Sequence, residues 1–172
     1  PRAERGGDYD RHYETVDDGE LIELGDVEIE AIHTPGNTSG MTAYAVDDVL
    51  FTGDGLFTES VARPDLEDPE AARSAAETLY ESLHDRVLSR LPNTVIAPGH
   101  FSDAATPASD ETYTAGLGDL EASMAALSMD REPFVEHVVE DMPPRPANYE
   151  DIIATNLGQL APDDERAFEL EL

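Results

Sequence analysis

Short apolar strands that each run directly into a Gly- or Pro-containing turn dominate the first hundred residues of the chain. Alternating or continuous apolar runs predict four of them, at Glu20–Leu24, Val27–His33, Met41–Val46 and Val49–Thr52. The Gly25-Asp26 pair between the first two has the chemistry of a hairpin turn. The chain is therefore expected to build a sheet of paired strands whose polar residues collect at the strand ends.

After the fourth strand the pattern changes to a helical period. Apolar residues recur at three- and four-residue steps and predict one helix over Pro69–Leu91, followed by a short strand at Thr94–Ala97. Three further helices are expected, at Glu111–Leu127, Asp130–Asp141 and Tyr149–Asn156. We therefore expect an α/β (α+β) protein with a sheet-bearing part, residues 1–107, and a helical C-terminal extension, residues 108–172, which could cap a site or form a homodimer.

The charge of the chain excludes several classes of partner. There are 10 Lys+Arg residues, all of them Arg, against 39 Asp+Glu, which gives a net charge of −29. A phosphate backbone or an anionic membrane would be repelled, so we expect no nucleic acid and no membrane partner. No apolar run approaches the roughly 18 residues of a membrane span. A carboxylate-saturated surface is typical of a halophilic, cytoplasmic protein, and that is the expected location.

Three polar residues follow strands and are candidates for chemistry. Asn37 lies in the loop after the second strand, Asp54 directly follows the fourth, and His100 follows the fifth. Loops at one edge of a sheet can bring such residues together in a metal site. Taken singly, each of these residues could also simply be part of a turn, without a functional role. The chain has no Cys, so any metal must bind through His, Asp, Glu or Asn.

The other histidines favour structural roles. His33 ends an alternating strand and is expected to be a hydrogen-bonded core residue rather than a ligand. His12, His84 and His137 lie in polar or amphipathic settings and are expected at the surface.

Four motifs, read together in their order and spacing, resemble the second half of the metallo-β-lactamase superfamily, most closely its glyoxalase II and persulfide dioxygenase branch. They are His33-Thr34-Pro35-Gly36-Asn37, Phe51-Thr52-Gly53-Asp54-Gly55, Ala62-Arg63-Pro64-Asp65-Leu66 and Ile96-Ala97-Pro98-Gly99-His100. The segments Pro143-Pro144-Arg145-Pro146 and Ile152-Ile153-Ala154-Thr155-Asn156 are similar to the C-terminal segment of sulfur-handling members.

The resemblance implies an αββα sandwich with a zinc or iron(II) site at one edge of its sheets. By motif match, Asp54 takes the place of the Asp ligand, which bridges two metals in the hydrolases, and His100 that of the last His ligand. Asn37 stands where the family has the second His of His-Thr-Pro-Gly-His, and its amide oxygen should bind these metals less tightly. Arg63 either orders its loop through Asp65 or binds an anionic thiol substrate.

The family's upstream His-x-His-x-Asp-His motif is absent, because the five histidines contain no pair spaced by two residues. We therefore expect the chain to be the C-terminal part of a longer metallo-β-lactamase domain, and residues 1–172 alone to be inactive. The expected whole protein is a metal-dependent enzyme acting on a small thiol-derived substrate. One possibility is a persulfide dioxygenase-like enzyme that uses ferrous iron and O₂. The alternatives are a glyoxalase II-like thioester hydrolase, in which two metals generate a hydroxide, and a non-catalytic binding module.

Overall fold

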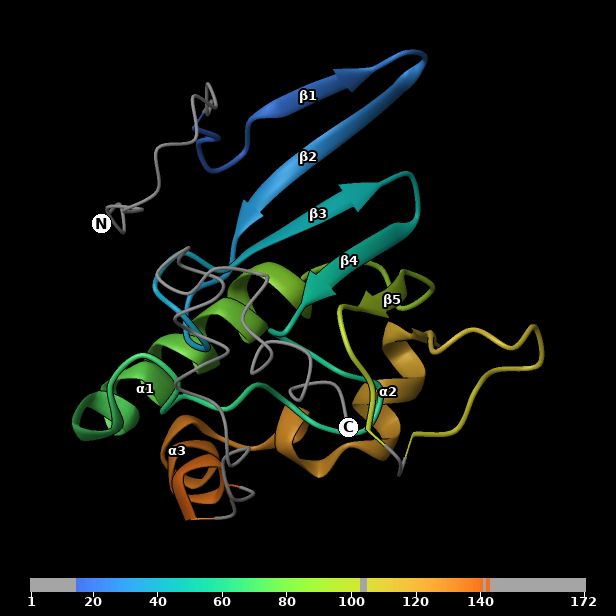
Figure 1. The fold of residues 1–172 in the computed structure, drawn as a ribbon. Coiled ribbons are helices and arrows are strands. Elements are labelled where there is room, and N and C mark those ends of the chain that lie inside the picture. The colour runs from blue at the N-terminus through green and yellow to red at the C-terminus, as the bar shows by residue number, and fades with distance from the viewer. Residues whose placement is uncertain (1–14, 103–104, 141, 143–172) are drawn as a thin grey trace, which may run out of the picture. The chain divides into compact units, whose positions relative to one another are not determined.

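The computed structural model describes residues 15–102, 105–140 and 142. Its residues from Val16 to Met142 form one compact unit. A single sheet organises that unit (Figure 1). Its six strands pair in chain order: β1 (Leu21–Leu24), β2 (Val27–His33), β3 (Thr42–Val46), β4 (Val49–Gly53), β5 (Val95–Pro98) and β6 (Ala115–Gly116). The first five strands agree with the sequence prediction to within a residue at each end, and the mixed α/β class is confirmed.

Two tight turns set the register of the first four strands. Leu24 pairs with Val27 across the β1–β2 turn, where Gly25 adopts a left-handed φ of 65°. Val46 pairs with Val49 across the β3–β4 turn, where Asp47 has a φ of 51°. Gly and Asp are residues that tolerate this conformation, so the turn chemistry visible in the sequence fixes both hairpins.

Strand direction decides where the loops lie. β2 is antiparallel to β3, which is antiparallel to β4, and β5 is parallel to β4. The carboxyl ends of β2, β4 and β5 therefore meet at the same edge of the sheet. The loops that carry Asn37, Asp54 and His100 all leave from that edge, as the sequence predicted.

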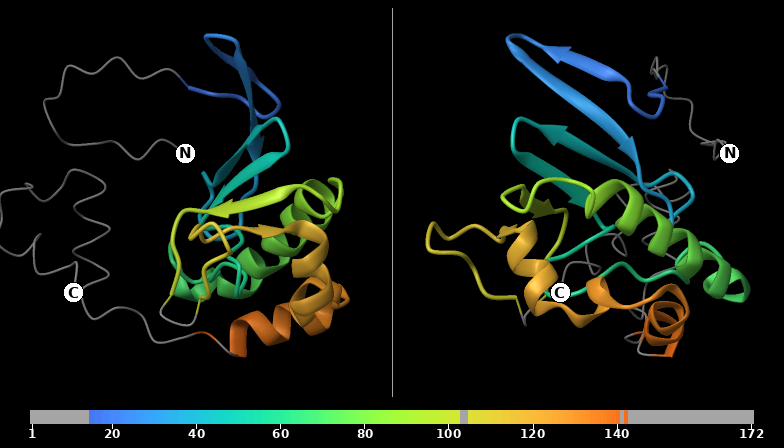
Figure 2. Two further views of the ribbon diagram at one scale, coloured as in Figure 1. Left: turned by 90° about the vertical axis from the view of Figure 1, so that its right-hand side faces the viewer. Right: turned by 180° about the vertical axis from the view of Figure 1, so that it is seen from behind.

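The helices cover one face of the sheet (Figure 2). They are η1 (Pro69–Ala71), α1 (Ala72–Ser82), the π-helical turn η2 (Leu83–Val87), α2 (Leu117–Ser123), η3 (Ala125–Ser128) and α3 (Arg131–Glu140). Alternation in the strands turns Ala43, Leu50 and Ile96 toward them, and all three are at most 1% exposed. Tyr44 and Phe51, which pair across β3 and β4, point to the opposite face and are 37% and 47% exposed.

Contacts between α1 and α3 close the helical side. Phe134 of α3 is fully buried and packs edge-on against Tyr80 of α1, with ring centroids 5.4 Å apart. Arg73 of α1 pairs with Glu132 at the start of α3, and Arg131 pairs with Glu81 at 2.9 Å. The apolar contacts carry most of this packing, since exposed ion pairs contribute little.

Two predicted helices differ from the structure. The helical run that begins at Pro69 ends at Val87 rather than Leu91, because Leu88 donates to the Leu83 carbonyl five residues back and the chain then turns. The predicted helix over Glu111–Leu127 is wrong at its start, and it is interrupted at Met124, whose extended backbone (φ −98°, ψ 101°) separates α2 from η3. Residues 115–116 instead pair with β5, and α2 begins only at Leu117.

The predictions for Tyr149–Asn156, for His12 and for the segments after residue 142 concern residues outside the described part of the chain. The division of the chain at residue 107 stays a prediction. Among the described residues, no helix is long and apolar enough to cross a bilayer.

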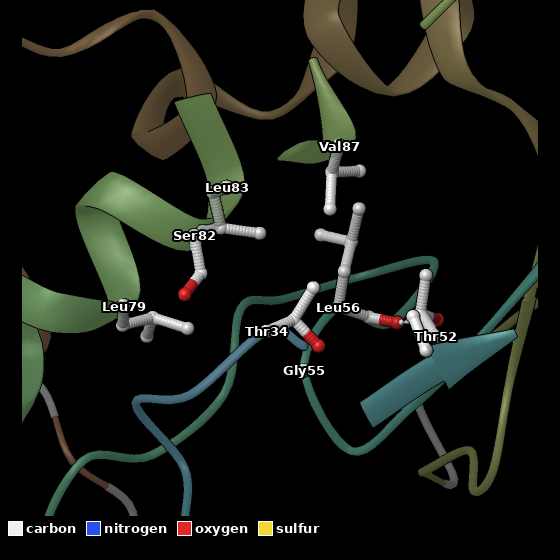
Figure 3. A pocket seen from close by; sticks show the side chains of 9 residues that line it. Thr34, Thr52, Gly55, Leu56, Leu79, Ser82, Leu83 and Val87 are labelled. Carbon is white, nitrogen blue, oxygen red and sulfur yellow. Dashed lines mark hydrogen bonds between the residues drawn. The ribbon is translucent and has the colours of Figure 1, made fainter. Parts of the chain in front are cut away.

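A small cavity lies between the sheet edge and α1 (Figure 3). Thr34, Thr52 and Leu56 reach it from the strand ends and their loops, and side chains of α1 and η2 close the other side. Its volume is about 10 Å³, which is the space of about one water molecule. It is therefore too small to hold a substrate.

Candidate metal centre

Asp54 and His100 form the centre of the candidate site. The imidazole Nδ1 of His100 lies 2.5 Å from Oδ1 of Asp54, although the two residues are 46 positions apart. Asp54 follows the last residue of β4, and His100 follows the Pro98-Gly99 end of β5. Their side chains are 34% and 76% exposed, so both are accessible at the edge of the sheet.

A close approach of two backbones makes this contact possible. Gly99 donates from its N–H to the Gly53 carbonyl at 2.8 Å, which extends the β4–β5 pairing beyond the strands. A Cβ atom at Gly99 would come within 3.3 Å of Gly53 and 3.4 Å of the Asp54 carboxylate. Gly53 itself has a left-handed φ of 55°. Glycine at both strand ends therefore lets the carboxylate and the imidazole meet.

Asn37 lies on the loop after β2 at the same edge, but it makes a different contact. Its side-chain Nδ2 donates to the Arg63 carbonyl at 3.1 Å, and the residue is only 5% exposed. Its Oδ1 is buried and has no hydrogen-bond partner among the described residues. Because a carbonyl accepts only from the NH₂ end of an amide, this contact fixes which amide atom is the oxygen. The described contacts tie Asn37 to Arg63 rather than to Asp54 or His100.

The guanidinium of Arg63 is engaged by Asp65. Nε and Nη2 donate to the two carboxylate oxygens at 2.8 and 3.1 Å, a bidentate pair whose side chains are 18% and 10% exposed. Such planar pairs hold a loop in one geometry. This contact accords with the loop-ordering role, and a substrate-binding role for Arg63 stays a prediction.

The segment after His100 is anchored on its other side. The Ser102 N–H donates to Glu59 at 3.0 Å, and the Phe101 ring stacks on Tyr113 with centroids 3.7 Å apart and planes 3° apart. Burial alone raises the pKa of Glu59. Hydrogen bonds from Thr58 and Ser102 outweigh it, so the pKa lies below its ordinary value. Glu59 is therefore an anionic anchor at neutral pH rather than a proton donor.

Two of the remaining histidine predictions need correction. His33 is hydrogen-bonded, through Nε2 to the Ser39 carbonyl at 3.0 Å, but it is exposed rather than in the core. It is the last residue of β2 and points to the face that the helices do not cover. His84 is only partly exposed, because its ring lies on Tyr80 with centroids 4.0 Å apart and its Nε2 is buried. His137 is exposed, as predicted.

The donor set fits the kind of metal that the resemblance implies, but it is incomplete. A carboxylate and an imidazole are ordinary ligands of zinc and of ferrous iron. In the described part of the chain, no cluster of three or more His, Cys, Asp or Glu residues could hold an ion. Asp54 and His100 would therefore contribute part of a coordination shell rather than all of it.

Sequence reasoning missed two residues that shape the edge. Ser82 of α1 donates to the Pro35 carbonyl at 2.7 Å, and Glu67 accepts from the N–H and hydroxyl of Ser39 at 2.8 and 3.1 Å. Both contacts hold the loop that carries Asn37. Neither residue belongs to a motif, and no local pattern marks a partner 28 or 47 positions away.

The chain is similar in sequence to several known proteins. The chain is 36% identical over 90 residues to an uncharacterized protein of Mycobacterium tuberculosis, covering 48% of this chain and 38% of that protein. It is 30% identical over 87 residues to the human mitochondrial persulfide dioxygenase ETHE1, covering 49% and 32%. The chain therefore spans about a third of the length of these relatives.

Solved structures share the fold. ETHE1 from Myxococcus xanthus superposes with a TM-score of 0.70 at 22% identity, covering 84% of this chain and 59% of that one. A metallo-beta-lactamase from Staphylococcus aureus gives 0.73 at 23% identity, covering 86% and 45%. The sequence model of the metallo-beta-lactamase superfamily matches residues 4–100, more than half of the chain. The chain therefore belongs to the metallo-beta-lactamase superfamily.

Proposed function

We propose that this chain is part of a metal-dependent enzyme that acts on sulfur compounds, with persulfide dioxygenase-like activity, and that Asp54 and His100 bind its metal. The observation that carries the proposal is their contact at 2.5 Å, formed by loops that leave the same edge of the sheet. The similarity to persulfide dioxygenase ETHE1 from three mammals supports the class of substrate.

A bound zinc or iron(II) ion would supply Lewis-acid polarisation, and iron also redox chemistry, at the exposed side of this pair. The chain's own residues would then do three things. Asp54 contributes the anionic oxygen and His100 the neutral nitrogen of the ligand set. The Glu59 anchor to Ser102 fixes the backbone just beyond His100, so the imidazole stays beside Asp54.

Asp54 and His100 are two ligands, and the coordination shell needs more, although no group of three or more His, Cys, Asp or Glu residues is found in the described part of the chain. We propose that the further ligands lie in sequence that precedes this half of the domain, and that the chain by itself turns over no substrate. Ligation of the metal by Asn37 stays a prediction. The small-molecule thiol substrate and the cytoplasmic location are likewise proposals.

The experiment uses the protein expressed from its complete reading frame. Metal content is measured by plasma mass spectrometry for the wild type and for Asp54→Asn and His100→Gln. We expect both variants to lose at least tenfold in metal affinity while keeping their circular dichroism spectrum. Glu28→Gln is the control, because it removes an exposed carboxylate of the β1–β2 hairpin that has no role in the proposed site. Its metal content should stay near that of the wild type.

Turnover then separates the candidate functions. Oxygen uptake with a low-molecular-weight persulfide, absent in Asp54→Asn, supports the dioxygenase proposal. Thioester hydrolysis without oxygen uptake would overturn it in favour of a glyoxalase II-like hydrolase. A wild type that holds less than about 0.2 metal per chain would refute the enzyme proposal and leave a binding module.

A further inference from the structure

The exposed imidazole of His100 depends on the backbone around it for its position. Its side chain is 76% exposed, so packing around the ring contributes little. The two residues that follow it are each fixed by a separate contact. The Ser102 N–H donates to Glu59 at 3.0 Å, and the Phe101 ring stacks on Tyr113. Tyr113 lies outside the four motifs that identify the metal site.

The Phe101 and Tyr113 rings form a parallel stack. Their centroids are 3.7 Å apart and their planes are inclined by 3°. Phe101 is 58% exposed, whereas Tyr113 is partly buried. Aromatic rings in contact stabilise each other beyond the area that they bury, so the Phe101 side chain cannot turn away without losing that stabilisation. The stack therefore restrains the residue that directly follows His100.

Tyr113 is itself held on both sides along the chain. Before it, a tight turn is closed by the Ala108 N–H, which donates to the Thr112 carbonyl at 2.7 Å. The Asp110 carboxylate accepts from the N–H and the hydroxyl of Thr112, at 3.1 and 2.7 Å. After it, β6 begins at Ala115 and pairs with β5. The Tyr113 ring is therefore presented from a hydrogen-bonded segment, which makes it a firm support for Phe101.

We infer that Tyr113 is a positioning residue for the metal site: by stacking on Phe101, it keeps His100 beside Asp54. The inference rests on the proposed function, in which His100 binds the metal. An exposed ligand whose backbone is already fixed loses less conformational freedom when the metal binds, so the affinity is higher. Glu59 holds the next residue of the chain, so the two contacts restrain neighbouring peptides beyond His100.

The first test needs no metal. Protein from the complete reading frame is prepared metal-free, and two quantities are measured by NMR at one pH: the ¹⁵Nδ1 shift of the His100 ring and the amide hydrogen exchange of Gly99 and Ser102. Both amides are hydrogen-bonded, one on each side of His100. Tyr113→Leu keeps an apolar side chain but no ring. We expect its two amides to exchange about tenfold faster, and its Nδ1 shift to move toward that of free imidazole.

Two further variants show whether the ring itself matters. Tyr113→Phe keeps the stack without the hydroxyl, and both quantities should stay within about twofold of the wild type. Tyr44→Leu is the matched control, because Tyr44 is a 37% exposed ring on β3, a strand that pairs with neither β5 nor β6. Unchanged exchange and Nδ1 shift in Tyr113→Leu would overturn the inference. Equal changes in Tyr44→Leu, or an equally large effect of Tyr113→Phe, would do the same.

Metal affinity then connects the stack to the site. The affinity for zinc or iron(II), whichever the wild type holds, is measured by competition with a chelator. We expect the Kd to rise about fivefold in Tyr113→Leu and to stay within about twofold in Tyr113→Phe and Tyr44→Leu. Faster exchange in Tyr113→Leu with unchanged metal affinity would overturn the positioning role. A wild type that binds neither metal would refute the proposed function instead, and the NMR result would still decide whether Tyr113 holds His100 beside Asp54.

Discussion

Gly36 lies against the backbone of Leu79, so close that a Cβ atom at Gly36 would come within 2.5 Å of both Cα and Cβ of Leu79. The loop after β2 thus packs directly on α1 with no side chain between them. Gly36 also has a φ of 139°, which side-chain-bearing residues rarely adopt. Space and backbone conformation therefore both require glycine here, and this contact fixes the loop that carries Asn37.

Gly36→Ala should be strongly destabilising. The methyl group must push the loop from α1 and the backbone must leave its φ, at a combined cost of at least about 2 kcal/mol. Chemical denaturation of the variant and the wild type measures the difference. Gly40→Ala is the matched control on the same loop, because nothing lies within 4 Å of its Cβ position. A loss of stability in Gly40→Ala as large as in Gly36→Ala would contradict this explanation.

Arg63→Lys separates a structural role from a substrate-binding role. Lysine keeps the charge but cannot make the bidentate contact to Asp65, so we expect a loss of about 2 kcal/mol in the free energy of unfolding. If Arg63 acts mainly through its loop, Asp65→Asn should give a similar loss. A variant as stable as the wild type but with a raised KM would instead favour contact with the substrate.

Asn37→His tests the residue that departs from the family pattern. Imidazole binds zinc and ferrous iron more tightly than an amide oxygen does, so metal affinity should rise about tenfold in the full reading frame. The replacement also removes the Nδ2 contact to the Arg63 carbonyl. Asn37→Ala removes the contact without adding a ligand and serves as the control. Unchanged metal affinity in Asn37→His would show that this position does not face the ion.

Asp18 should make stability depend on pH in the acid range. The backbone N–H of His33, with help from the Arg86 guanidinium, holds the pKa of Asp18 below its ordinary value of 3.8. The ionised carboxylate is therefore favoured by folding. Its contribution is complete above pH 3.8 and is lost as the pH falls through the lower folded-state pKa.

Asp18→Asn should accordingly be less stable than the wild type at neutral pH, and the two should converge as the solution is acidified. Thermal unfolding followed across the acid range measures this. A gap between Asp18→Asn and wild type that widens on acidification would contradict the assignment.

Salt should raise the stability of the whole chain. With a net charge of −29, carboxylates repel one another in the folded state, and added salt screens that repulsion. We expect the melting temperature to rise steadily from low ionic strength to molar KCl. Sucrose, which strengthens burial without screening charge, is the control and should raise it far less at low ionic strength. A melting temperature independent of KCl would argue against a surface adapted to salt.

The local parts of the fold could be predicted from the sequence because their causes are local. Alternation in Val27–His33 and the Gly25-Asp26 turn define the first hairpin, and both features are contained within neighbouring residues. The placement of Asp54 and His100 at one edge also followed from the order of strands and turns. Asp54 and His100 are in contact at this edge, whereas Asn37 lies at the same edge and contacts Arg63 instead. That these residues bind a metal stays a prediction.

Elements that depend on distant partners could not be predicted in this way. Ala115 and Gly116 pair with Ile96 and Val95 of β5. The contact continues just beyond the strand, where Leu117 donates to the Thr94 carbonyl and Gly118 to that of Pro92, at 2.9 and 2.8 Å. Nothing in the periodicity of Glu111–Leu127 indicates these partners. For the same reason the position of His84 over Tyr80 was missed, since its amphipathic setting gave no sign of a buried ring nitrogen.

The parallel pairing of β4 with β5 also orders events during folding. The β1–β2 and β3–β4 hairpins close over two-residue turns, on a scale of about 1–10 μs for such units. β5 can join β4 only after the chain from residue 54 to residue 94 has formed its crossover, and closing so long a loop is slow. Asp54 lies at the end of β4 before this step, and His100 comes next to it only when β5 pairs with β4. We therefore expect the pair to be among the last native contacts to form, so a kinetic probe at His100 should report completion of the fold and one in either hairpin its beginning.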